Sequence, residues 1–421
     1  MIEMTKETRK CSFCGKEGKD VDMLISGVDA HICERCVEQA NTIVAEEKTQ
    51  KEKQKIPSFR LFKPIEIKKH LDQYVIGQDE AKKVLSVAVY NHYKRINYPA
   101  PKPEDEEGVE LEKSNIVMVG ETGTGKTLMA RTIAKKMQVP FCIADATVLT
   151  EAGYVGEDVE SILTRLLQVA DYDVAAAERG IVFIDEVDKI ARKSDNPSIT
   201  RDVSGEGVQQ ALLKLLEGAV VHVPPQGGRK HPEQKMIQVN TQNILFVCGG
   251  AFDGIEKRIM SRMQANAIGY GTRSTAPIDR ENMLQYIAPQ DLKSFGLIPE
   301  LVGRMPVLTH FNPLDRDALR QILSEPRNSL IKQYKKLFEM DDVELVIEDE
   351  VLDYLVDKAV EFKLGARGLR SICEIVMLDA MYDIPSKAGK DAGKMEVFHL
   401  TLDYTRKRLD ENHLNQLRAA S

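Results

Sequence analysis

The 421-residue sequence lacks the features typical of membrane, secreted and nucleic-acid-binding proteins. No stretch approaches the roughly 18 consecutive apolar residues that a membrane-spanning helix needs. The N-terminal stretch Met1 to Lys10 is polar, without the apolar core of a signal peptide, so we expect a cytoplasmic protein with no membrane partner. The formal net charge is −7, whereas proteins that neutralise nucleic-acid phosphates usually carry a basic face. We therefore expect no nucleic-acid partner.

Cysteine is also scarce, and four of the seven cysteines lie near the N-terminus. Cys11-x2-Cys14 and Cys33-x2-Cys36 are separated by 18 residues, the spacing of a zinc site with four cysteine ligands. Gly15 suits a tight turn in which backbone N–H groups point at sulfur. Four ligands close the coordination shell, so the expected Zn²⁺ site is structural. The other cysteines have apolar neighbours and are expected to be buried: Cys142, Cys248 and Cys373.

Two other uses of the four clustered cysteines are possible. A redox pair is disfavoured because no βαβ pattern flanks it, and an iron–sulfur site is the remaining alternative. A domain of about 45 residues is too small to be stable by core packing alone. Structural zinc contributes about 10–16 kcal/mol in finger-like peptides and would supply the missing stability.

The chain divides into four segments by composition. Residues 1–46 form the expected zinc domain, and residues 47–62 are expected to be a flexible linker because ten consecutive residues, 46–55, lack an apolar side chain. Residues 63–313 contain apolar runs typical of buried parallel strands, at 116–119, 181–184 and 244–247, separated by helical patterns. This alternation predicts an α/β fold with a parallel sheet flanked by helices. Residues 314–421 are predicted to be a smaller α+β domain.

A phosphate-binding loop follows the first of these strands. Residues 120–127 read Gly-Glu-Thr-Gly-Thr-Gly-Lys-Thr and match G-x-x-x-x-G-K-[ST] between a strand and a helix. Glycines allow backbone N–H groups to surround phosphate oxygens, and the helix N-terminus adds a positive dipole. Lys126 would reach the β- and γ-phosphates. The expected ATP contacts in this region are Gly120, Glu121, Thr122, Gly123, Thr124, Gly125, Lys126, Thr127 and Leu128.

A pair of carboxylates follows the second strand. Asp185, together with the Thr127 hydroxyl, would hold Mg²⁺, and Glu186 would orient or deprotonate the attacking water. Asp188 extends the run to Asp-Glu-Val-Asp, which invites comparison with helicases. A motor that moves nucleic acid therefore stays open as an alternative, as does an adaptor without enzymatic activity that docks partners through the zinc domain.

The order of these motifs resembles the ClpX family of AAA+ unfoldases. The four-cysteine domain, the charged linker, the segment Leu71–Gln78, the phosphate loop, Gly153–Gly156 and Gly365–Arg370 occur in the family's order, over about residues 10 to 415. The resemblance implies an AAA+ P-loop ATPase domain, a small C-terminal domain and an ATP-dependent protein unfoldase. Its implied partners are five copies of itself in a homohexamer, a Clp-type peptidase ring, unfolded and tagged protein substrates, and adaptors on the zinc domain.

The resemblance also implies roles for individual residues. Val75 and Ile76 fall where the family packs adenine, Arg304 matches an arginine finger that reaches a neighbouring subunit, and Arg367 matches a nucleotide-sensing arginine. The residues that match substrate-gripping pore loops are Gly153, Tyr154, Val155, Gly156, Arg229, Lys230 and His231. The residues that match the peptidase-docking loop are Ile268, Gly269 and Tyr270, where the family has Phe in place of Tyr270. No polar sensor residue is evident after the third strand.

Overall fold

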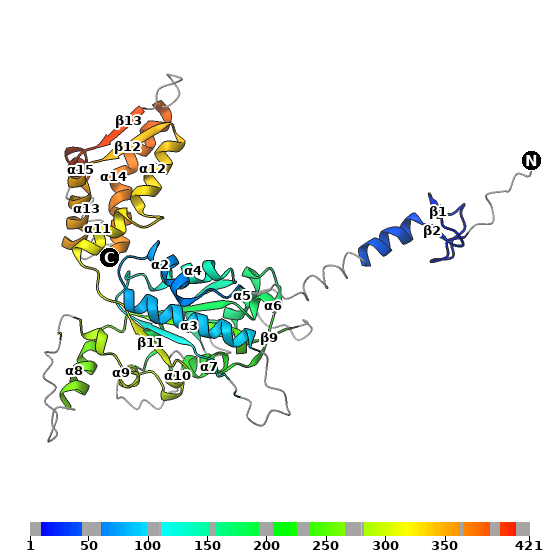
Figure 1. Ribbon diagram of the computed structural model, residues 1–421, viewed down its shortest axis with the longest axis horizontal. Helices are drawn as coiled ribbons and strands as arrows, with labels where there is room; N and C mark the ends of the chain where they lie inside the picture. Colours follow the sequence, from blue (N-terminus) through cyan, green and yellow to red (C-terminus); the bar gives the residue numbers. More distant parts are fainter. Residues whose placement is uncertain are drawn as a thin grey trace, which may run out of the picture. The chain divides into compact units, whose positions relative to one another are not determined.

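The computed structural model describes residues 10–43, 60–98, 109, 111–150, 156–192, 205–224, 236–265, 279, 282–362, 365–387 and 396–409. It consists of two compact units, Met1–Arg60 and Leu61–Ser421. Figure 1 shows both units.

The first unit contains a small antiparallel hairpin and a helix. Strands β1 (Leu24–Ser26) and β2 (His31–Cys33) pair, and residues 34–43 are helical. Its buried cluster consists of three cysteines, Cys11, Cys33 and Cys36, with a few aliphatic side chains packed at its edge. Such a cluster is too small to stabilise the unit by hydrophobic burial alone.

The second unit begins with an α/β part built on a five-stranded sheet. The sheet strands are β3 (Ile116–Val119), β4 (Phe141–Asp145), β7 (Ile181–Asp185), β10 (Leu245–Gly250) and β11 (Val307–His310). All neighbouring pairs are parallel, in the order β11-β3-β10-β7-β4. The helices of this part are α2 (Pro64–Asp72), α3 (Asp79–Asn97), α4 (Lys126–Met137), α5 (Ser161–Val169), α6 (Val174–Ala177), α7 (Glu206–Glu217), α8 (Ile255–Ala265), α9 (Pro289–Phe295) and α10 (Pro299–Gly303).

Short elements complete the α/β part. Two further strand pairs are β5 (Leu149–Thr150) with β6 (Glu157–Asp158), and β8 (Val220–Val223) with β9 (Ile237–Asn240). Turns of 3₁₀ helix are η2 (Ala146–Val148), η3 (Val187–Ile190), η4 (Thr241–Asn243) and η5 (Met283–Tyr286).

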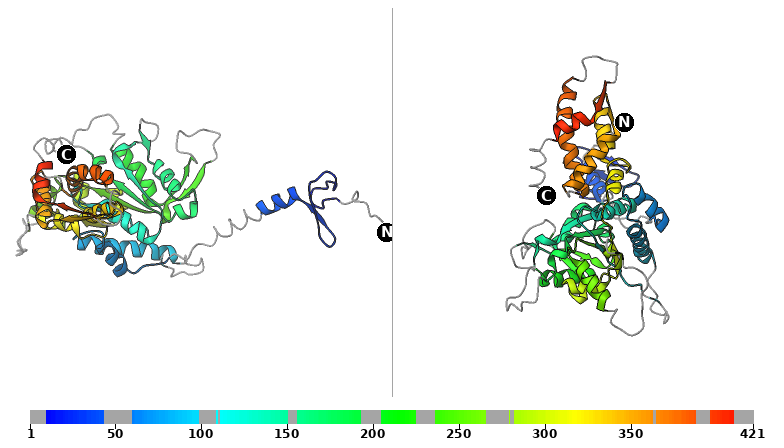
Figure 2. Two further views of the ribbon diagram at one scale, coloured as in Figure 1. Left: turned by 90° about the horizontal axis from the view of Figure 1, so that it is seen from above. Right: turned by 90° about the vertical axis from the view of Figure 1, so that its left-hand side faces the viewer.

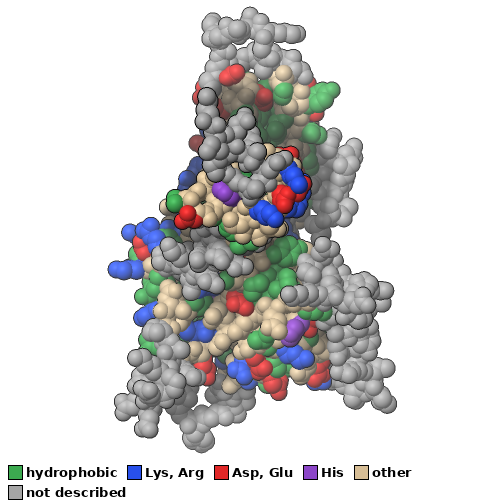
Figure 3. All heavy atoms as spheres, turned by 90° about the vertical axis from the view of Figure 1, so that its right-hand side faces the viewer, with side chains coloured by type: hydrophobic (Ala, Val, Ile, Leu, Met, Phe, Trp, Pro, Cys, Tyr) green, Lys and Arg blue, Asp and Glu red, His purple; other side chains and the backbone are tan. Residues whose placement is uncertain are grey.

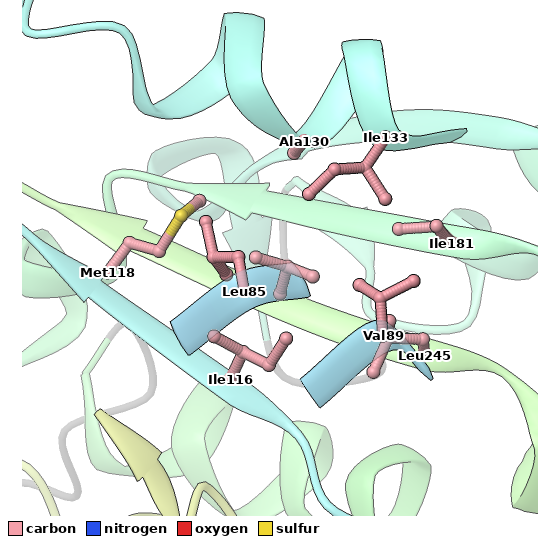
Figure 4. Close-up of a pocket in the computed structure, with 9 residues that line it drawn as sticks. Leu85, Val89, Ile116, Met118, Ala130, Ile133, Ile181 and Leu245 are labelled. Atoms are coloured by element: carbon pink, nitrogen blue, oxygen red, sulfur yellow. The ribbon is translucent and has the colours of Figure 1, made fainter. Parts of the chain in front are cut away.

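The central strands bury both faces, as expected for a parallel sheet covered by helices. Val117 and Val119 of β3 belong to a large core cluster with residues of α5 and α7. Ile116 and Met118 of the same strand point the other way, toward α3 and α4. A cavity of about 10 Å³ with an entirely apolar lining lies on that side (Figure 4). The predicted α/β fold is therefore confirmed.

The C-terminal part of the second unit has a separate hydrophobic core. Its helices pack beside a parallel pair, β12 (Val343–Ile347) and β13 (Glu396–Leu400), which is labelled in Figure 1 and seen from another side in Figure 2. The helices are α11 (Arg316–Ser324), α12 (Leu330–Met340), α13 (Asp349–Glu361), α14 (Gly365–Lys387) and α15 (Leu402–Arg408). This arrangement confirms the predicted α+β character of the C-terminal part.

The surface carries both signs of charge. On the face drawn in Figure 3, basic and acidic side chains of the described residues are interspersed. Across the described ranges, no helix combines the length and the apolar character needed to span a bilayer.

Candidate active site and metal centre

The phosphate loop lies at the carboxyl end of β3, where parallel α/β sheets usually bind ligands. Residues 120–125 connect β3 directly to α4, whose first residue is Lys126. Gly125 has a φ of +100°, which favours glycine. Gly120 has no room for a side chain because a Cβ there would lie 2.7 Å from Phe311 Cβ. The loop's glycines are thus required by backbone geometry and by close packing.

The Lys126 side chain is buried and curls back over the loop. Its Nζ donates to the carbonyl oxygens of Gly120 and of Glu121, the latter at 2.8 Å. Burial lowers the pKa of Lys126, Asp185 and Asp188 act in the opposite direction, and Arg367 lowers the pKa further. Asp185 and Arg367, which are far from Lys126 in sequence, therefore both lie within electrostatic reach of it.

The two expected magnesium ligands lie side by side at the carboxyl edge of the sheet. Thr127 Oγ1 donates to Asp185 Oδ2 at 3.1 Å. A hydroxyl and a carboxylate at this distance are suited to a hard cation that takes oxygen ligands. Glu186 follows with an exposed side chain and a φ of +55°, a left-handed backbone that costs a non-glycine residue about 1–3 kcal/mol. Such strain is typical of functional sites.

Asp188, the last carboxylate of the acidic run, makes a structural contact. It is 6% exposed, and its Oδ1 accepts from the Ala251 N–H at 3.1 Å, just after β10. The carboxylate thus ties η3 to the end of the neighbouring strand. The strand β10 ends in Gly249 and Gly250, neither of which has a side chain. The end of this strand therefore provides no polar side chain for the sensor role.

Val75 contributes an apolar wall beside the phosphate loop. A Cβ built on Gly125 would lie 3.9 Å from Val75 Cγ1, and Ile76 is half-buried next to it. Leu128, in the first turn of α4, is 47% exposed. These apolar groups flank the loop that is expected to hold phosphate.

The start of α14 also approaches the loop. A Cβ built on Gly123 would lie 3.9 Å from the backbone nitrogen of Ala366. Gly365 opens α14 with a φ of +57°, and Arg367 follows with an exposed side chain. The C-terminal part of the unit therefore presents a helix N-terminus and an arginine to the phosphate loop.

Gln78 is a functional candidate that sequence reasoning missed. It is 7% exposed, donates from Nε2 to the Asn312 carbonyl at 2.8 Å and accepts from the Asn312 N–H at 2.8 Å. The pair joins the segment that contains Val75 to the chain just before α11. The Gln73 carbonyl accepts from Arg327 N–H at 2.8 Å, a second tie to the C-terminal part. Partners 234 positions apart leave no local sequence signal.

Arg304 directly follows α10. Its guanidinium pairs with Glu217, the last residue of α7, with Nη2 2.9 Å from Oε1. Three other sets of predicted residues fall outside the described residues: Gly153, Tyr154 and Val155 of the first pore loop; Arg229, Lys230 and His231; and Ile268, Gly269 and Tyr270. Gly156, the last residue of the first pore loop, is among the described residues and is exposed.

The four N-terminal cysteines form one cluster. Their sulfur atoms all lie within 4.8 Å of one another, with Cys11 to Cys36 at 3.9 Å and Cys14 to Cys33 at 3.7 Å. Tetrahedral Zn–S bonds of about 2.3 Å place the sulfurs about 3.8 Å apart, so the cluster fits zinc.

Backbone N–H groups support the cysteine cluster. The Cys33 N–H donates to Cys11 Sγ at 3.3 Å, and Gly15, at φ +76°, closes the first turn by donating to the Cys11 carbonyl. Hydrogen bonds from backbone N–H groups, that of Cys14 foremost, lower the pKa of Cys11 to about 6. Desolvation raises the pKa of Cys36, so a cation is needed to hold four thiolates together.

The three remaining cysteines are core residues, as predicted. Cys142, Cys248 and Cys373 are each at most 5% exposed, and burial raises the pKa of each thiol to about 12. They are unreactive at neutral pH because the thiolate is the nucleophilic form.

Three family models match the chain. Residues 9–46 match the ClpX C4-type zinc finger, residues 111–308 the AAA domain (Cdc48 subfamily), and residues 314–397 the C-terminal, D2-small domain, of ClpB protein. Together with the phosphate loop and its carboxylates, these matches define an AAA+ ATPase that carries a zinc finger. The chain hydrolyses ATP and uses ATP, Mg²⁺ and Zn²⁺.

Full-length relatives narrow the class further. The chain is 63% identical to proteins of Bacteroides thetaiotaomicron, over 99% of both chains, and of Bacteroides fragilis, over 100% of both chains. It is 64% identical to a protein of Porphyromonas gingivalis, over 91% of this chain and 94% of that one. Each is named ATP-dependent Clp protease ATP-binding subunit ClpX. The chain belongs to the ClpX family of ATP-dependent protein unfoldases.

Family membership decides between the alternatives left open by the sequence. A non-enzymatic adaptor is wrong because the chain is an ATPase. Membership of an unfoldase family favours protein over nucleic acid as the moved polymer. The matched zinc-finger model favours zinc over an iron–sulfur cluster.

Proposed function

We propose that six copies of this chain form a cytoplasmic ring that unfolds tagged proteins and threads them into a Clp-type peptidase. The observation that carries the proposal is the meeting of Lys126, Thr127 and Asp185 at the end of β3, beside the first turn of α14. A nucleotide in that place would contact both parts of the second unit. Its hydrolysis would then change the arrangement of these two parts relative to each other, and a motor requires such a conformational change.

Each residue of the site has a proposed task in hydrolysis. Mg²⁺, when bound, neutralises phosphate charge, and Thr127 and Asp185 would hold it. Lys126 binds the β- and γ-phosphates, Val75, Ile76 and Leu128 contact the base and sugar, and Arg367 senses the nucleotide from α14. Glu186 orients the attacking water and accepts its proton. Its exposed side chain and left-handed backbone are consistent with a group aimed at a ligand.

The ring supplies the remaining catalytic group. Arg304 is proposed to act on the ATP of the neighbouring subunit, because its partner in this chain is Glu217 and not the phosphate loop. The domains are proposed to be 1–46 for zinc and adaptors, 47–62 for the linker, 63–313 for the large ATPase domain and 314–421 for the small one.

Substrate grip and peptidase docking are assigned to loops. Tyr154, flanked by Gly153, Val155 and Gly156, would grip the polypeptide, and Arg229, Lys230 and His231 would line the pore entrance. Unfolding a domain costs about 5–15 kcal/mol, so repeated unfolding needs an energy source such as ATP.

Ile268, Gly269 and Tyr270 would fill an apolar cleft on the peptidase. Six such loops would act together through effective concentration. The test is degradation of a tagged protein by this chain with a Clp-type peptidase. Ile268→Glu should abolish degradation and peptidase binding while ATPase activity remains, and Tyr270→Phe should bind at least as well as the parent. Parental degradation by Ile268→Glu would remove this loop from docking.

A further inference from the structure

The backbone of the residues that flank α10, Ile298 and Arg304, is fixed by hydrogen bonds at both ends of the helix. At its start, the Ile298 N–H donates to Oε1 of Gln209 at 2.7 Å, and Gln209 is completely buried. At its end, the Arg304 carbonyl accepts from Nδ2 of Asn115 at 2.8 Å, and Asn115 is 1% exposed. Both contacts are buried amide hydrogen bonds, and breaking either would leave a buried donor or acceptor without its partner, which costs free energy. The backbone at Arg304 is therefore held rigidly.

Asn115 also brings the end of α7 to the same point. Its Nδ2 donates to the Leu216 carbonyl at 3.1 Å, so one amide group links α10, α7 and the residue before β3. Glu217 follows Leu216 and ends α7. The position of Glu217 relative to Arg304 is consequently set by the same buried contact.

The side chain of Arg304, in contrast, extends over the surface. It is 52% exposed, and an arginine of that exposure would otherwise sample many rotamers. Glu217 restricts it: Nε and Nη2 both donate to Oε1, at 3.1 Å and 2.9 Å. This contact uses the Nε edge of the guanidinium and leaves the Nη1 group, with further N–H donors, for another acceptor. An exposed ion pair contributes little to stability, so its value lies in orientation.

We propose that Glu217 is a positioning residue for Arg304, holding its guanidinium in the orientation that serves the ATP of the neighbouring subunit. The inference rests on the proposed role of Arg304 in trans. A finger that is oriented before the neighbour binds ATP loses less conformational freedom in the transition state. Glu217 does not touch nucleotide in its own subunit, and it acts only through Arg304.

Single variants give the first readout. Glu217→Ala should lower kcat for ATP about tenfold, less than removal of the finger would, and leave KM within about twofold. Glu217→Gln keeps an oxygen acceptor and should recover part of the loss. Glu300→Ala is the matched control, because Glu300 is an exposed carboxylate one turn earlier in α10. Among the described residues, the carboxylate paired with Arg304 is that of Glu217. Glu300→Ala should keep the parental kcat.

Mixed rings give the readout that a merely structural role would not produce. Lys126→Ala subunits have a defective phosphate loop and an intact finger. When they co-assemble with Glu217→Ala subunits, some interfaces pair an intact phosphate loop with a correctly held Arg304. ATPase activity per Glu217→Ala subunit should then rise several-fold. The same mixture with Arg304→Ala subunits is run in parallel, with co-assembly confirmed by labelled subunits.

The two mixtures separate the possible failures. Recovery with Arg304→Ala but not with Glu217→Ala would overturn the positioning role of Glu217, as would a parental kcat in Glu217→Ala alone. No recovery in either mixture would overturn the finger in trans and the role of Glu217 with it. In an Arg304→Ala background, Glu217→Ala should cause no further loss, and an additional tenfold loss there would also contradict the proposal.

Discussion

Thr127 donates its hydroxyl hydrogen to Asp185 at 3.1 Å, although the two residues are 58 positions apart in the chain. The contact exists because β3 and β7 flank β10 in a parallel sheet, so that the residues following β3 and those ending β7 meet at one edge. Glu186 comes directly after Asp185 and has an exposed side chain. This geometry supports the proposed division of two carboxylate tasks, metal binding by Asp185 and water activation by Glu186.

The first prediction separates these two tasks. Glu186→Gln should bind ATP with an affinity near the parental value and hydrolyse it at least about a hundredfold more slowly, because metal binding survives and proton acceptance does not. Asp185→Asn should weaken Mg²⁺-dependent binding as well. Fluorescent-nucleotide titration and phosphate release measure the two effects. Turnover of Glu186→Gln within about threefold of the parent would exclude Glu186 from the mechanism.

The second prediction concerns the metal. Cys33→Ser or a strong chelator should unfold the first unit, since its buried cluster consists largely of the cysteines themselves. The ATPase activity of the second unit, which has its own cores, should persist in Cys33→Ser, and after chelation once Mg²⁺ is supplied in excess of the chelator. Circular dichroism and metal analysis provide the measurement. Iron in place of zinc, or less than one metal ion per chain in the parent, would contradict the assignment.

Most of the fold could be predicted because the central strands are buried on both faces. The runs at β3, β7 and β10 are almost continuously apolar, which makes them visible in sequence. The edge strands β4 and β11 were missed. Their residues are only partly buried, and in β11 polar and apolar residues are mixed, so that this strand has no continuous apolar run.

The candidate site divides in a similar way between local and long-range features. The phosphate loop, Asp185, Glu186 and the four cysteines lie in short motifs with a recognisable spacing. Gln78 with Asn312, and Arg304 with Glu217, are contacts between distant segments. Neither pair has a local pattern, because only the folded chain brings the partners together.

The third prediction uses the cavity between the sheet and the helices α3 and α4. Val89 lines this cavity, and Figure 4 shows its side chain directed into it. Val89→Ile adds one methyl group to a space of about 10 Å³ and should stabilise the second unit by up to about 1 kcal/mol. The matched control is Val87→Ile on the same helix, where the side chain is 42% exposed and no change is expected. Urea denaturation measures both, and destabilisation by Val89→Ile beyond that of Val87→Ile would contradict the prediction.

The fourth prediction concerns pH. His92 is 4% exposed, its Nε2 donates to the Asn243 carbonyl at 3.0 Å, and its Nδ1 is buried without a partner. Burial, with Arg95 and Lys113 nearby, lowers the pKa of His92 to about 3. The unfolded chain has the usual pKa of about 6.5 and binds the proton first as the pH falls. The contribution of His92 is therefore complete above about pH 6.5 and is lost progressively toward pH 3.

The variant His92→Gln isolates this effect, because glutamine can donate to Asn243 and does not titrate. Between pH 6 and 4, the parental free energy of unfolding should fall more steeply than that of the variant, by up to about 1.4 kcal/mol per pH unit. Denaturant titrations at a series of pH values measure the difference. Identical slopes in parent and variant would show that His92 is not kept neutral by burial.

The central claim is that ATP hydrolysis at the site of Asp185 and Glu186 drives protein unfolding. The most direct test is loss of fluorescence from a tagged, stably folded fluorescent protein incubated with this chain, a Clp-type peptidase and ATP. The parent should destroy the fluorescence only while it hydrolyses ATP. Glu186→Gln should leave the fluorescence intact, and Tyr154→Ala should hydrolyse ATP without removing it. Loss of fluorescence at the parental rate with Glu186→Gln, or an intact substrate across a panel of tags despite full ATPase activity of the parent, would contradict the account.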